Sequence, residues 1–155
     1  MHTNTQRLFT ISSILFNAVT ILLFVTSLLS YVYEKQPSVS NLKIVSLQPF
    51  SSEFKGRNII LNPQTDLTDV FHLNVKQIFL YVKMIAGDKK EMIWSQIVQK
   101  NDIKNIDKSF VNNYRFFEIP KGTNVSFELR GCIFPFVGLT KDKLFSKTTY
   151  KVPIH

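Results

Sequence analysis

Residues 8–33 contain no Asp, Glu, Lys or Arg in 26 consecutive positions, and 15 of these residues are Leu, Ile, Phe or Val. An α-helix rises about 1.5 Å per residue, so the run would extend ~39 Å, more than the ~30 Å hydrocarbon core of a bilayer. Tyr31 and Tyr33 lie at one border and Arg7 at the other, where aromatic rings and cations favour the headgroup level. The run therefore predicts a transmembrane anchor at residues 8–33.

The same run could instead be a cleaved secretory signal, because Val25-Thr26-Ser27 offers small residues of the kind found at cleavage sites. The apolar core of a signal peptide is about 7–15 residues long, whereas here apolar residues continue through Val32. An uncleaved anchor is the favoured interpretation. Basic residues near the two ends are nearly balanced, but a short N-terminal tail before a long domain favours a single-pass type II protein. The predicted organisation is a cytosolic tail at 1–7, the anchor at 8–33 and a lumenal domain at 34–155.

Beyond the anchor the apolar pattern is that of β-strands. Val125, Phe127 and Leu129 alternate with polar residues, and residues 75–85 place Ile78, Leu80, Val82 and Met84 on one face, with Phe79 and Tyr81 on the other. Residues 101–113 are ambiguous between a short helix and a polar connection. Further strands are expected at 42–47, 57–61, 92–98, 114–119 and 148–152, separated by turn signals at Pro49, Asn62-Pro63, Gly87-Asp88, Pro120-Lys121-Gly122 and Gly138. The predicted fold is a single N-terminal transmembrane helix followed by an all-β domain, a β-sandwich of about seven strands.

The charge pattern argues against nucleic-acid binding. The chain carries a formal charge of +8, but its bases are dispersed and form no run of five or six like charges. A solvated surface that matches an acidic protein partner is the better interpretation.

A search for reactive groups finds no G-x-S-x-G, no H-E-x-x-H and no pair of cysteines, since Cys132 is the only one. The histidines are isolated at positions 2, 72 and 155. Ser40 and Ser52 each precede a lysine by three residues, a spacing used by some acyl-transfer enzymes, but this chemistry needs a helix and Ser40 enters a predicted strand. Asp66 and Asp69 are interpreted as turn residues. We therefore expect no catalytic residue, no metal, no cofactor and no small-molecule substrate; Trp94 is expected in the core or an interface, and Cys132 as a small buried hydrophobe.

One face of the anchor is small and polar. At 100° per residue, a narrow sector contains Ser13, Asn17, Thr20 and Ser27, together with Thr10, Phe24 and Tyr31. Transmembrane helices pack through such residues, and Asn17 is the one most costly to leave unpaired. The alternative is that Ser and Thr hydroxyls bond back to their own helix.

A segment in the middle of the chain resembles a known family. Residues 66–82 read DLTDVFHLNVKQIFLYV, similar to the D-L-x-x-x-F-x-W-N-x-K-Q-x-F-x-Y segment of signal peptidase complex subunit 3, the glycoprotein accessory subunit of the endoplasmic reticulum signal peptidase. Trp94 follows in a segment resembling the family's W-D-x-I-V strand, and Asn124-Val125-Ser126 resembles its glycosylated N-V-T/S. Two departures are Leu73, where the family favours Trp, and Arg130-Gly131, where Trp-Asn is usual. The matching motif positions are Asp66, Leu67, Phe71, Asn74, Lys76, Gln77, Phe79, Tyr81 and Trp94.

The resemblance implies a non-catalytic subunit in the endoplasmic reticulum membrane that binds the catalytic serine-peptidase subunit and other subunits of the complex and supports removal of signal peptides. It also makes Asn124 the glycosylation candidate, although chance alone predicts about one or two such acceptor patterns in a chain of this composition. Two alternatives remain open. One is a secreted or membrane-anchored β-sandwich binding module unrelated to signal peptidase, and the other is a type II lumenal hydrolase using Ser40 or Ser52.

Overall fold

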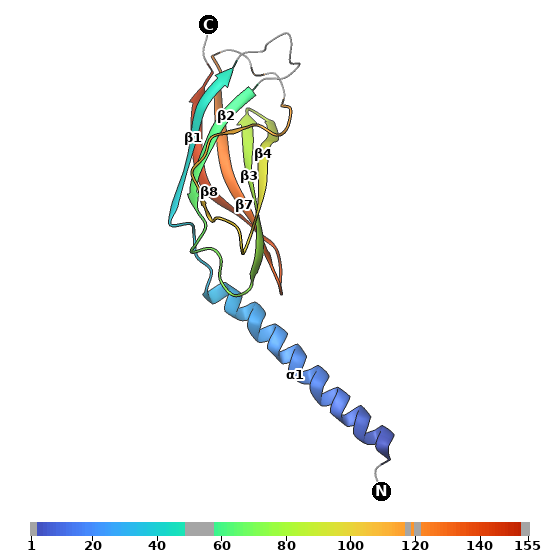
Figure 1. Ribbon diagram of the computed structural model, residues 1–155. Helices are drawn as coiled ribbons and strands as arrows, with labels where there is room; N and C mark the ends of the chain where they lie inside the picture. Colours follow the sequence, from blue (N-terminus) through green and yellow to red (C-terminus); the bar gives the residue numbers. More distant parts are fainter. Residues whose placement is uncertain (1–2, 49–57, 117–118, 120–121, 153–155) are drawn as a thin grey trace.

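In the computed structural model, the described residues are 3–48, 58–116, 119 and 122–152. They form one long helix and two antiparallel β-sheets. The helix, α1 (Asn4–Val32), projects from one end of the β domain, away from the sheets (Figure 1). This arrangement confirms the predicted combination of an N-terminal apolar helix and a β-sandwich.

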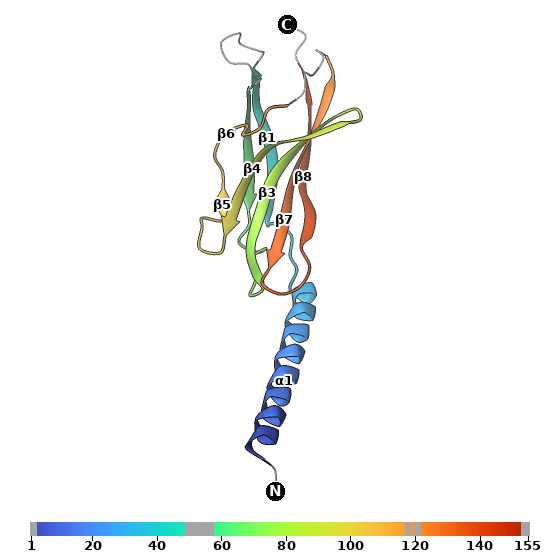
Figure 2. The ribbon, with the colours of Figure 1, turned by 90° about the vertical axis from the view of Figure 1, so that its right-hand side faces the viewer.

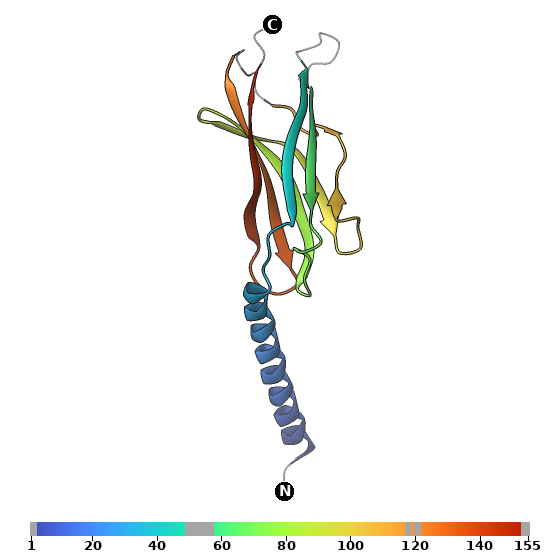
Figure 3. The same cartoon turned by 90° about the vertical axis from the view of Figure 1, so that its left-hand side faces the viewer.

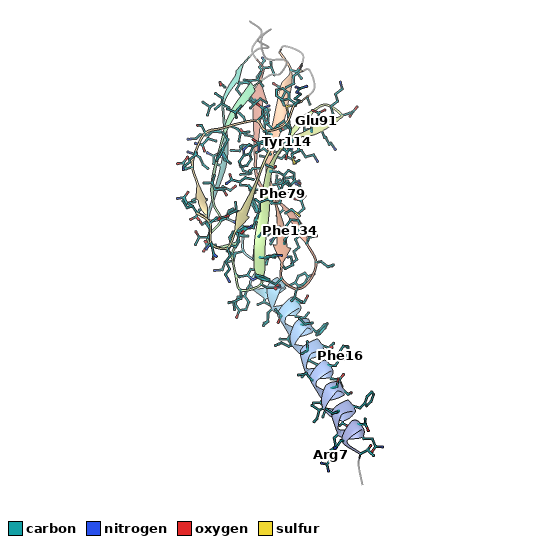
Figure 4. All side chains as sticks on the ribbon, turned by 45° about the vertical axis from the view of Figure 1, so that its right-hand side comes forward. Arg7, Phe16, Phe79, Glu91, Tyr114 and Phe134 are labelled. Atoms are coloured by element: carbon teal, nitrogen blue, oxygen red, sulfur yellow. The ribbon has the colours of Figure 1, made fainter. Side chains whose placement is uncertain are left out.

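Helix α1 has 29 residues, which corresponds to about 43 Å at 1.5 Å per residue. Thr3 caps its start in a capping box with Gln6, and Tyr33 closes its end by donating its backbone N–H to the carbonyl of Leu29. None of the helix's residues is buried, and Phe16 projects freely from its middle (Figure 4). An apolar helix exposed on every side is long enough and apolar enough to cross a membrane.

The described residues of the β domain form eight strands in two sheets. Sheet A contains β1 (Val39–Gln48), β2 (Asn58–Asp66) and the short strands β5 (Asn105–Ile106) and β6 (Phe110–Val111), which both pair with β2. Sheet B has the order β4-β3-β7-β8, from β3 (Val75–Ala86), β4 (Lys89–Gln99), β7 (Asn124–Pro135) and β8 (Lys141–Lys151). Figure 3 shows the sheets as two layers, with β1 and β2 in one and β7 and β8 in the other.

The core lies between the two sheets and follows the predicted alternation. Strand β3 is central in sheet B, paired with both β4 and β7, and its inner residues are fully buried. Trp94 is also buried, and its ring lies 5.0 Å from that of Phe110. The apolar residues that meet between the sheets include Leu42, Ile59, Leu61, Ile78, Leu80, Val82, Met84, Trp94, Val125, Phe127 and Leu129.

Two local expectations were wrong, and one segment that the sequence left ambiguous is now assigned. Asn62-Pro63 is not a turn but lies inside β2, where Pro63 pairs with Leu42 of β1. On its other edge β2 pairs with β6 at residues 60–61 and with β5 at residues 65–66. Pro63 has no N–H to donate, and it occupies the gap between these two short partners.

The ambiguous segment and the second wrong expectation both lie between β4 and β7. Residues 101–113 contain no helix; they carry β5 and β6, so Ile103 is exposed while Ile106 is buried. The strand expected at 114–119 is absent from its described residues, because 114–116 and 119 have no strand pairing. The serine–lysine pair at 52 and 55 and the turn signal at Pro49 lie outside the described residues.

The helix meets the β domain at what we call its base. The base consists of the β2–β3 loop (residues 67–74) and the β7–β8 loop (residues 136–140), which lie beside the end of α1 in Figures 1 and 2. The β3–β4 turn, where Gly87 has φ 60°, lies at the far end and projects from the domain in Figure 2. The chain thus has a membrane-side end and a distal end.

Candidate functional site

The end of α1 is held against the base by polar contacts, and we call this region the joint. Its central residues are Ser30, Tyr31, Glu34, Asn74, Val137 and Lys141. They come from the helix, from the linker after it, from the end of the β2–β3 loop and from the β7–β8 turn. The joint therefore brings together parts of the chain that are far apart in sequence.

Asn74 connects three of these parts. Its Nδ2 donates to the Val137 carbonyl at 2.7 Å and to the Ser30 hydroxyl, and its Oδ1 accepts from the Val137 N–H at 3.0 Å. Its own carbonyl accepts from the N–H of Phe136 at 2.8 Å. Only 5 % of Asn74 is exposed, so its amide and carbonyl groups could not bond to water, and these contacts supply their hydrogen-bond partners instead. Asn74 thus ties the β7–β8 loop to the helix.

Ionic contacts lie on the other side of the joint. Glu34 accepts from Lys141 at 2.5 Å and also pairs with Lys143, while Lys141 Nζ lies 3.5 Å from the centre of the Tyr31 ring, in a cation–π contact. Burial alone would raise the pKa of the Glu34 carboxyl, but the hydrogen bonds and positive charge of the two lysines outweigh it and lower the pKa below its ordinary value of 4.5. Glu34 is therefore held ionised between two cations.

His72 completes the joint from the β2–β3 loop. Its Nδ1 accepts from the Asn74 N–H at 3.3 Å, so this nitrogen carries no proton. Burial lowers the pKa of His72 below 6.5; nearby Glu34 opposes this effect, and Lys141 adds to it. A hollow of about 30 Å³ beside these residues has room for one or two water molecules. The joint is thus a connection between the helix and the β domain with a small hollow beside it.

The residues of the family motif do not form one cluster but lie in several parts of the fold. Asp66 accepts from the Thr68 N–H at 2.9 Å and hydroxyl at 2.6 Å, which lowers its pKa and confirms its interpretation as a turn residue. Leu67 and Trp94 belong to the core, whereas Asn74 lies in the joint. Phe71 is half-buried beneath Lys104, Lys76 is exposed and Gln77 is half-buried. Phe79 and Tyr81 lie on the outer surface of sheet B.

That outer face of sheet B is partly apolar and only half covered. The Phe79 and Tyr81 rings stack at 5.6 Å between centroids, and Tyr81 donates to Asp142 at 3.0 Å. Figure 4 shows Tyr114, Phe79 and Phe134 one below the other on this side. Beside them, Ile97 is 53 % exposed and Tyr114 42 %. The inner face of β3 is fully buried, whereas its outer face, which carries Phe79 and Tyr81, stays half exposed.

A charged row crosses the same face. Arg130 donates to Asp142 at 2.7 Å and to Glu128 at 3.3 Å, and Lys147 pairs with Glu128 at 3.3 Å. The hydrogen bond to Asp142 raises the pKa of Arg130 despite partial burial, so the guanidinium stays charged. The outer face of sheet B therefore combines aromatic area with paired charges.

Most groups considered for chemistry do not converge. Ser40 and Lys43 lie on strand β1 three residues apart, which places their side chains on opposite faces of the sheet. Among the described residues no group of three or more His, Cys, Asp or Glu could hold a metal ion. Cys132 is half-buried, and burial raises the pKa of its thiol. His2 and His155 lie outside the described residues.

The polar face of the anchor divides into two parts. Ser27 is half-buried beside the β7–β8 loop, where a Cβ at Gly138 would lie 3.0 Å from its hydroxyl oxygen. Thr10 and Thr20 donate to the carbonyls of Gln6 and Phe16, four residues earlier, as the alternative interpretation expects. Ser13 and Asn17 are exposed, and the structure of the described residues gives Asn17 no side-chain hydrogen bond. Asn17 remains the polar group most in need of a partner.

Sequence reasoning identified Asn74 through its motif but missed Glu34, Lys141, Lys143 and Gly138 as members of the joint. No local signal marks them, because each depends on contact between distant segments. The pair Glu34 and Lys141, for example, is separated by 107 positions. Asn124 is exposed at the start of β7, as a glycosylation acceptor must be.

Comparison with known proteins points in one direction. Signal peptidase complex subunit 3 of Caenorhabditis briggsae is 26% identical over 128 residues, covering 73% of this chain and 70% of that protein. A family model described as signal peptidase subunit matches residues 1–155. The matched residues include the long apolar helix, the β-sandwich and the whole motif at residues 66–82. The chain belongs to the signal peptidase subunit family.

Proposed function

We propose that this protein is a non-catalytic accessory subunit of the endoplasmic reticulum signal peptidase complex, which binds the catalytic serine-peptidase subunit and holds it at the membrane surface. In this proposal residues 1–7 are cytosolic, α1 crosses the membrane and the β domain, residues 34–155, is lumenal. Membership of the signal peptidase subunit family and the similarity to a protein named signal peptidase complex subunit 3 support the proposal.

The observation that carries the proposal is the joint. A flexible linker between an anchor and a domain would leave the position and orientation of the domain undefined. Here the hydrogen bonds of buried Asn74 and the ion pairs of Glu34 fix the base to the end of α1. A domain held at a set height and angle can present one face to a partner anchored in the same membrane. The substrate's cleavage site emerges from the membrane at that level.

We propose the outer face of sheet B as the contact with the catalytic subunit. Phe79 and Tyr81 belong to the family motif, yet they lie on this face rather than in the core. Aromatic side chains surrounded by paired charges are typical of protein interfaces. Ile97, 53 % exposed, adds an aliphatic side chain next to Phe79, with which it pairs across the strands.

A partner helix is proposed to pack on Ser13 and Asn17 of α1. An Asn amide in hydrocarbon without a partner is costly, and interhelical bonds of this kind contribute about 0.6–2 kcal/mol. Ser27, at the membrane-side level of the β7–β8 loop, continues this face toward the base. The helix and the β domain would thus both contact the complex.

The test is co-purification in mild detergent with the full-length chain as bait. We expect a serine-peptidase subunit to co-purify with the natural sequence and unprocessed precursors to accumulate when the chain is depleted. Ile97→Asp should lower recovery of that subunit, because a carboxylate would be desolvated in the contact. The matched control is Val45→Asp on β1, which changes an exposed aliphatic residue, 58 % exposed, in the other sheet. Equal recovery with both variants would rule out the outer face of sheet B.

The helix contact has its own control. Asn17→Leu should lower recovery of the peptidase subunit more than Leu22→Ala, which alters an exposed residue about 140° away around α1. A chain that purifies alone and monodisperse under these conditions would contradict the proposed function. Measurement of the intact mass separately tests the secreted alternative, because cleavage after Ser27 would remove the anchor.

A further inference from the structure

We propose that the base of the β domain is a second membrane contact, in which Phe136 and Leu139 of the β7–β8 loop enter the lipid interface beside α1, with Leu73 of the β2–β3 loop at its edge. The occupant is the bilayer itself, at the boundary between headgroups and acyl chains. This proposal rests on the membrane-crossing anchor of the proposed function but needs no contact with the catalytic subunit.

The depth of the β7–β8 loop carries the proposal. Gly138 lies against Ser27, whose hydroxyl oxygen would be 3.0 Å from a Cβ built at that glycine. Ser27 precedes Tyr31 by four residues, or about 6 Å along the helix toward the membrane centre. Tyr31 and Tyr33 are the residues expected at the headgroup level. The loop therefore reaches below that level, and in Figure 1 α1 leans beneath this side of the domain.

The side chains at this level are apolar and exposed. Leu73 is 89 % exposed, Leu139 77 % and Phe136 60 %. Val32, at the end of α1, is likewise 77 % exposed. In water these residues would form an unfavourable apolar surface, and each buried CH₂ group would contribute about 0.8 kcal/mol on entering lipid. The surface continues directly from the anchor that lipid already surrounds.

Three backbone groups at the start of the β7–β8 loop already have partners within the protein. Backbone N–H and C=O groups near hydrocarbon need partners within the protein. The N–H of Phe136 donates to the Asn74 carbonyl, and both backbone groups of Val137 bond to the Asn74 side chain. Lys141 and Lys143 are paired with Glu34, while Lys35, which lines the hollow at the joint, is exposed and can meet lipid headgroups.

A bilayer fits this surface better than one partner helix. Phe136 and Leu139 lie in the loop that joins two strands of sheet B, whereas Leu73 lies in the loop that leaves sheet A. Figures 1 and 2 show both loops at the same end, beside the helix. Apolar side chains that are spread over both layers of the base fit the flat surface of a bilayer better than the narrow surface of a single helix.

The test measures depth in the full-length chain, reconstituted alone into phosphatidylcholine nanodiscs. In a Cys132→Ala background, single cysteines replace Leu139, Phe136 or Leu73 and carry an environment-sensitive fluorophore. Asp88, exposed in the distal β3–β4 turn, is the control site. We expect probes at 139 and 136 to shift to the blue and to lose fluorescence when lipids carry nitroxides near the top of the acyl chain. The probe at 73 should respond to headgroup nitroxides, and the probe at 88 to neither.

Two results would overturn the proposal. One is emission from positions 139 and 136 that matches position 88 and ignores the nitroxide lipids. The other is quenching that disappears in the purified complex, which would assign the base to a protein partner. Circular dichroism of each labelled chain verifies its fold. Because the nanodisc measurement uses the isolated chain, it can support the membrane contact even if co-purification contradicts the proposed function. Co-purification can likewise support the proposed function even if the nanodisc measurement contradicts the membrane contact.

Discussion

The ammonium group of Lys141 lies 3.5 Å from the centre of the Tyr31 ring while it donates to Glu34 at 2.5 Å. One side chain from the start of β8 thus contacts both the last turn of the anchor and the linker that follows it. Together with the Asn74 amide, this contact makes the transition from helix to β domain a rigid connection. The connection sets the distance between the β domain and the membrane. It also decides which face of the domain points along the membrane plane.

Replacing Asn74 by alanine should weaken this connection. The change leaves the N–H and C=O of Val137 without side-chain partners, and a buried unsatisfied group costs about 1–3 kcal/mol. We expect a lower thermal midpoint in detergent and faster proteolysis of the β7–β8 loop. Asn105→Ala, an exposed asparagine in β5, is the control and should change the free energy of unfolding by less than about 0.5 kcal/mol. Equal effects would mean that Asn74 does not hold the loop.

A methyl group at Gly138 should separate the loop from the helix. Gly138 has φ 112°, a conformation that side-chain-bearing residues rarely adopt, and its Cβ would lie 3.0 Å from the Ser27 hydroxyl oxygen. We expect Gly138→Ala to destabilise the joint by about 1–3 kcal/mol from backbone strain, with the steric contact in addition. The double variant with Ser27→Ala removes the oxygen and should recover only the steric part. Thermal unfolding of the four chains in this cycle gives the coupling, and a coupling of zero would contradict the contact.

The period-two pattern of the sequence predicted β3 and β7 correctly, because a half-buried strand must alternate whatever it pairs with. The last strand was expected only at 148–152, whereas β8 extends from Lys141 to Lys151. Ile78, Leu80, Val82 and Met84 are all fully buried, as expected. The pattern failed at Pro63. A proline interrupts a strand only where a neighbouring strand needs the missing N–H as a donor. Pro63 lies at the gap between β5 and β6, and the residues that leave this gap come more than 40 positions later in the chain. Local sequence does not contain that information.

The joint illustrates the same limit. Asn74 was singled out by its motif, but its partners Ser30 and Val137 lie 44 and 63 positions away. Likewise, Ser27 belongs to the polar face of the anchor, and the fold places it beside Gly138 of its own chain. A residue type can indicate that a polar group needs a partner, but only the fold determines which partner it finds.

Gly131→Ala should destabilise the domain through a steric clash. A Cβ at this position would lie 2.3 Å and 2.4 Å from two ring carbons of Phe145, which packs over the glycine. Overpacking of this kind costs about 1–3 kcal/mol. Combining it with Phe145→Leu, which removes those two carbons, should restore part of the loss, as measured by the midpoint of chemical unfolding. If the double variant is as unstable as the sum of the two single variants, the clash is not the cause.

The stability of the joint should depend on pH in two separate windows. The pKa of His72 is below 6.5 in the folded chain, so as pH falls below 6.5 the unfolded state binds a proton first and stability decreases. Protonation at Nδ1 would also remove the acceptor of the Asn74 N–H. The lowered pKa of Glu34 makes a second contribution, which is complete above 4.5 and is lost as pH falls below that value. Thermal midpoints between pH 7.5 and 5.5 should fall less in His72→Gln than in the natural chain, and identical slopes would contradict this assignment.

Glycosylation of Asn124 would report the side of the membrane on which the domain lies. Asn124 is exposed and begins β7, whose start lies at the end of the domain opposite α1 (Figure 1). A lumenal domain expressed in cells that glycosylate Asn-x-Ser should therefore migrate more slowly on a gel, and glycosidase treatment should reverse the shift. Asn124→Gln and Ser126→Ala should both abolish the shift, whereas Ser126→Thr should keep it, because threonine preserves the acceptor pattern. A chain that never shifts, while a control acceptor inserted at the β3–β4 turn does, would show a lumenal domain whose Asn124 is not used; failure of both would contradict the type II orientation.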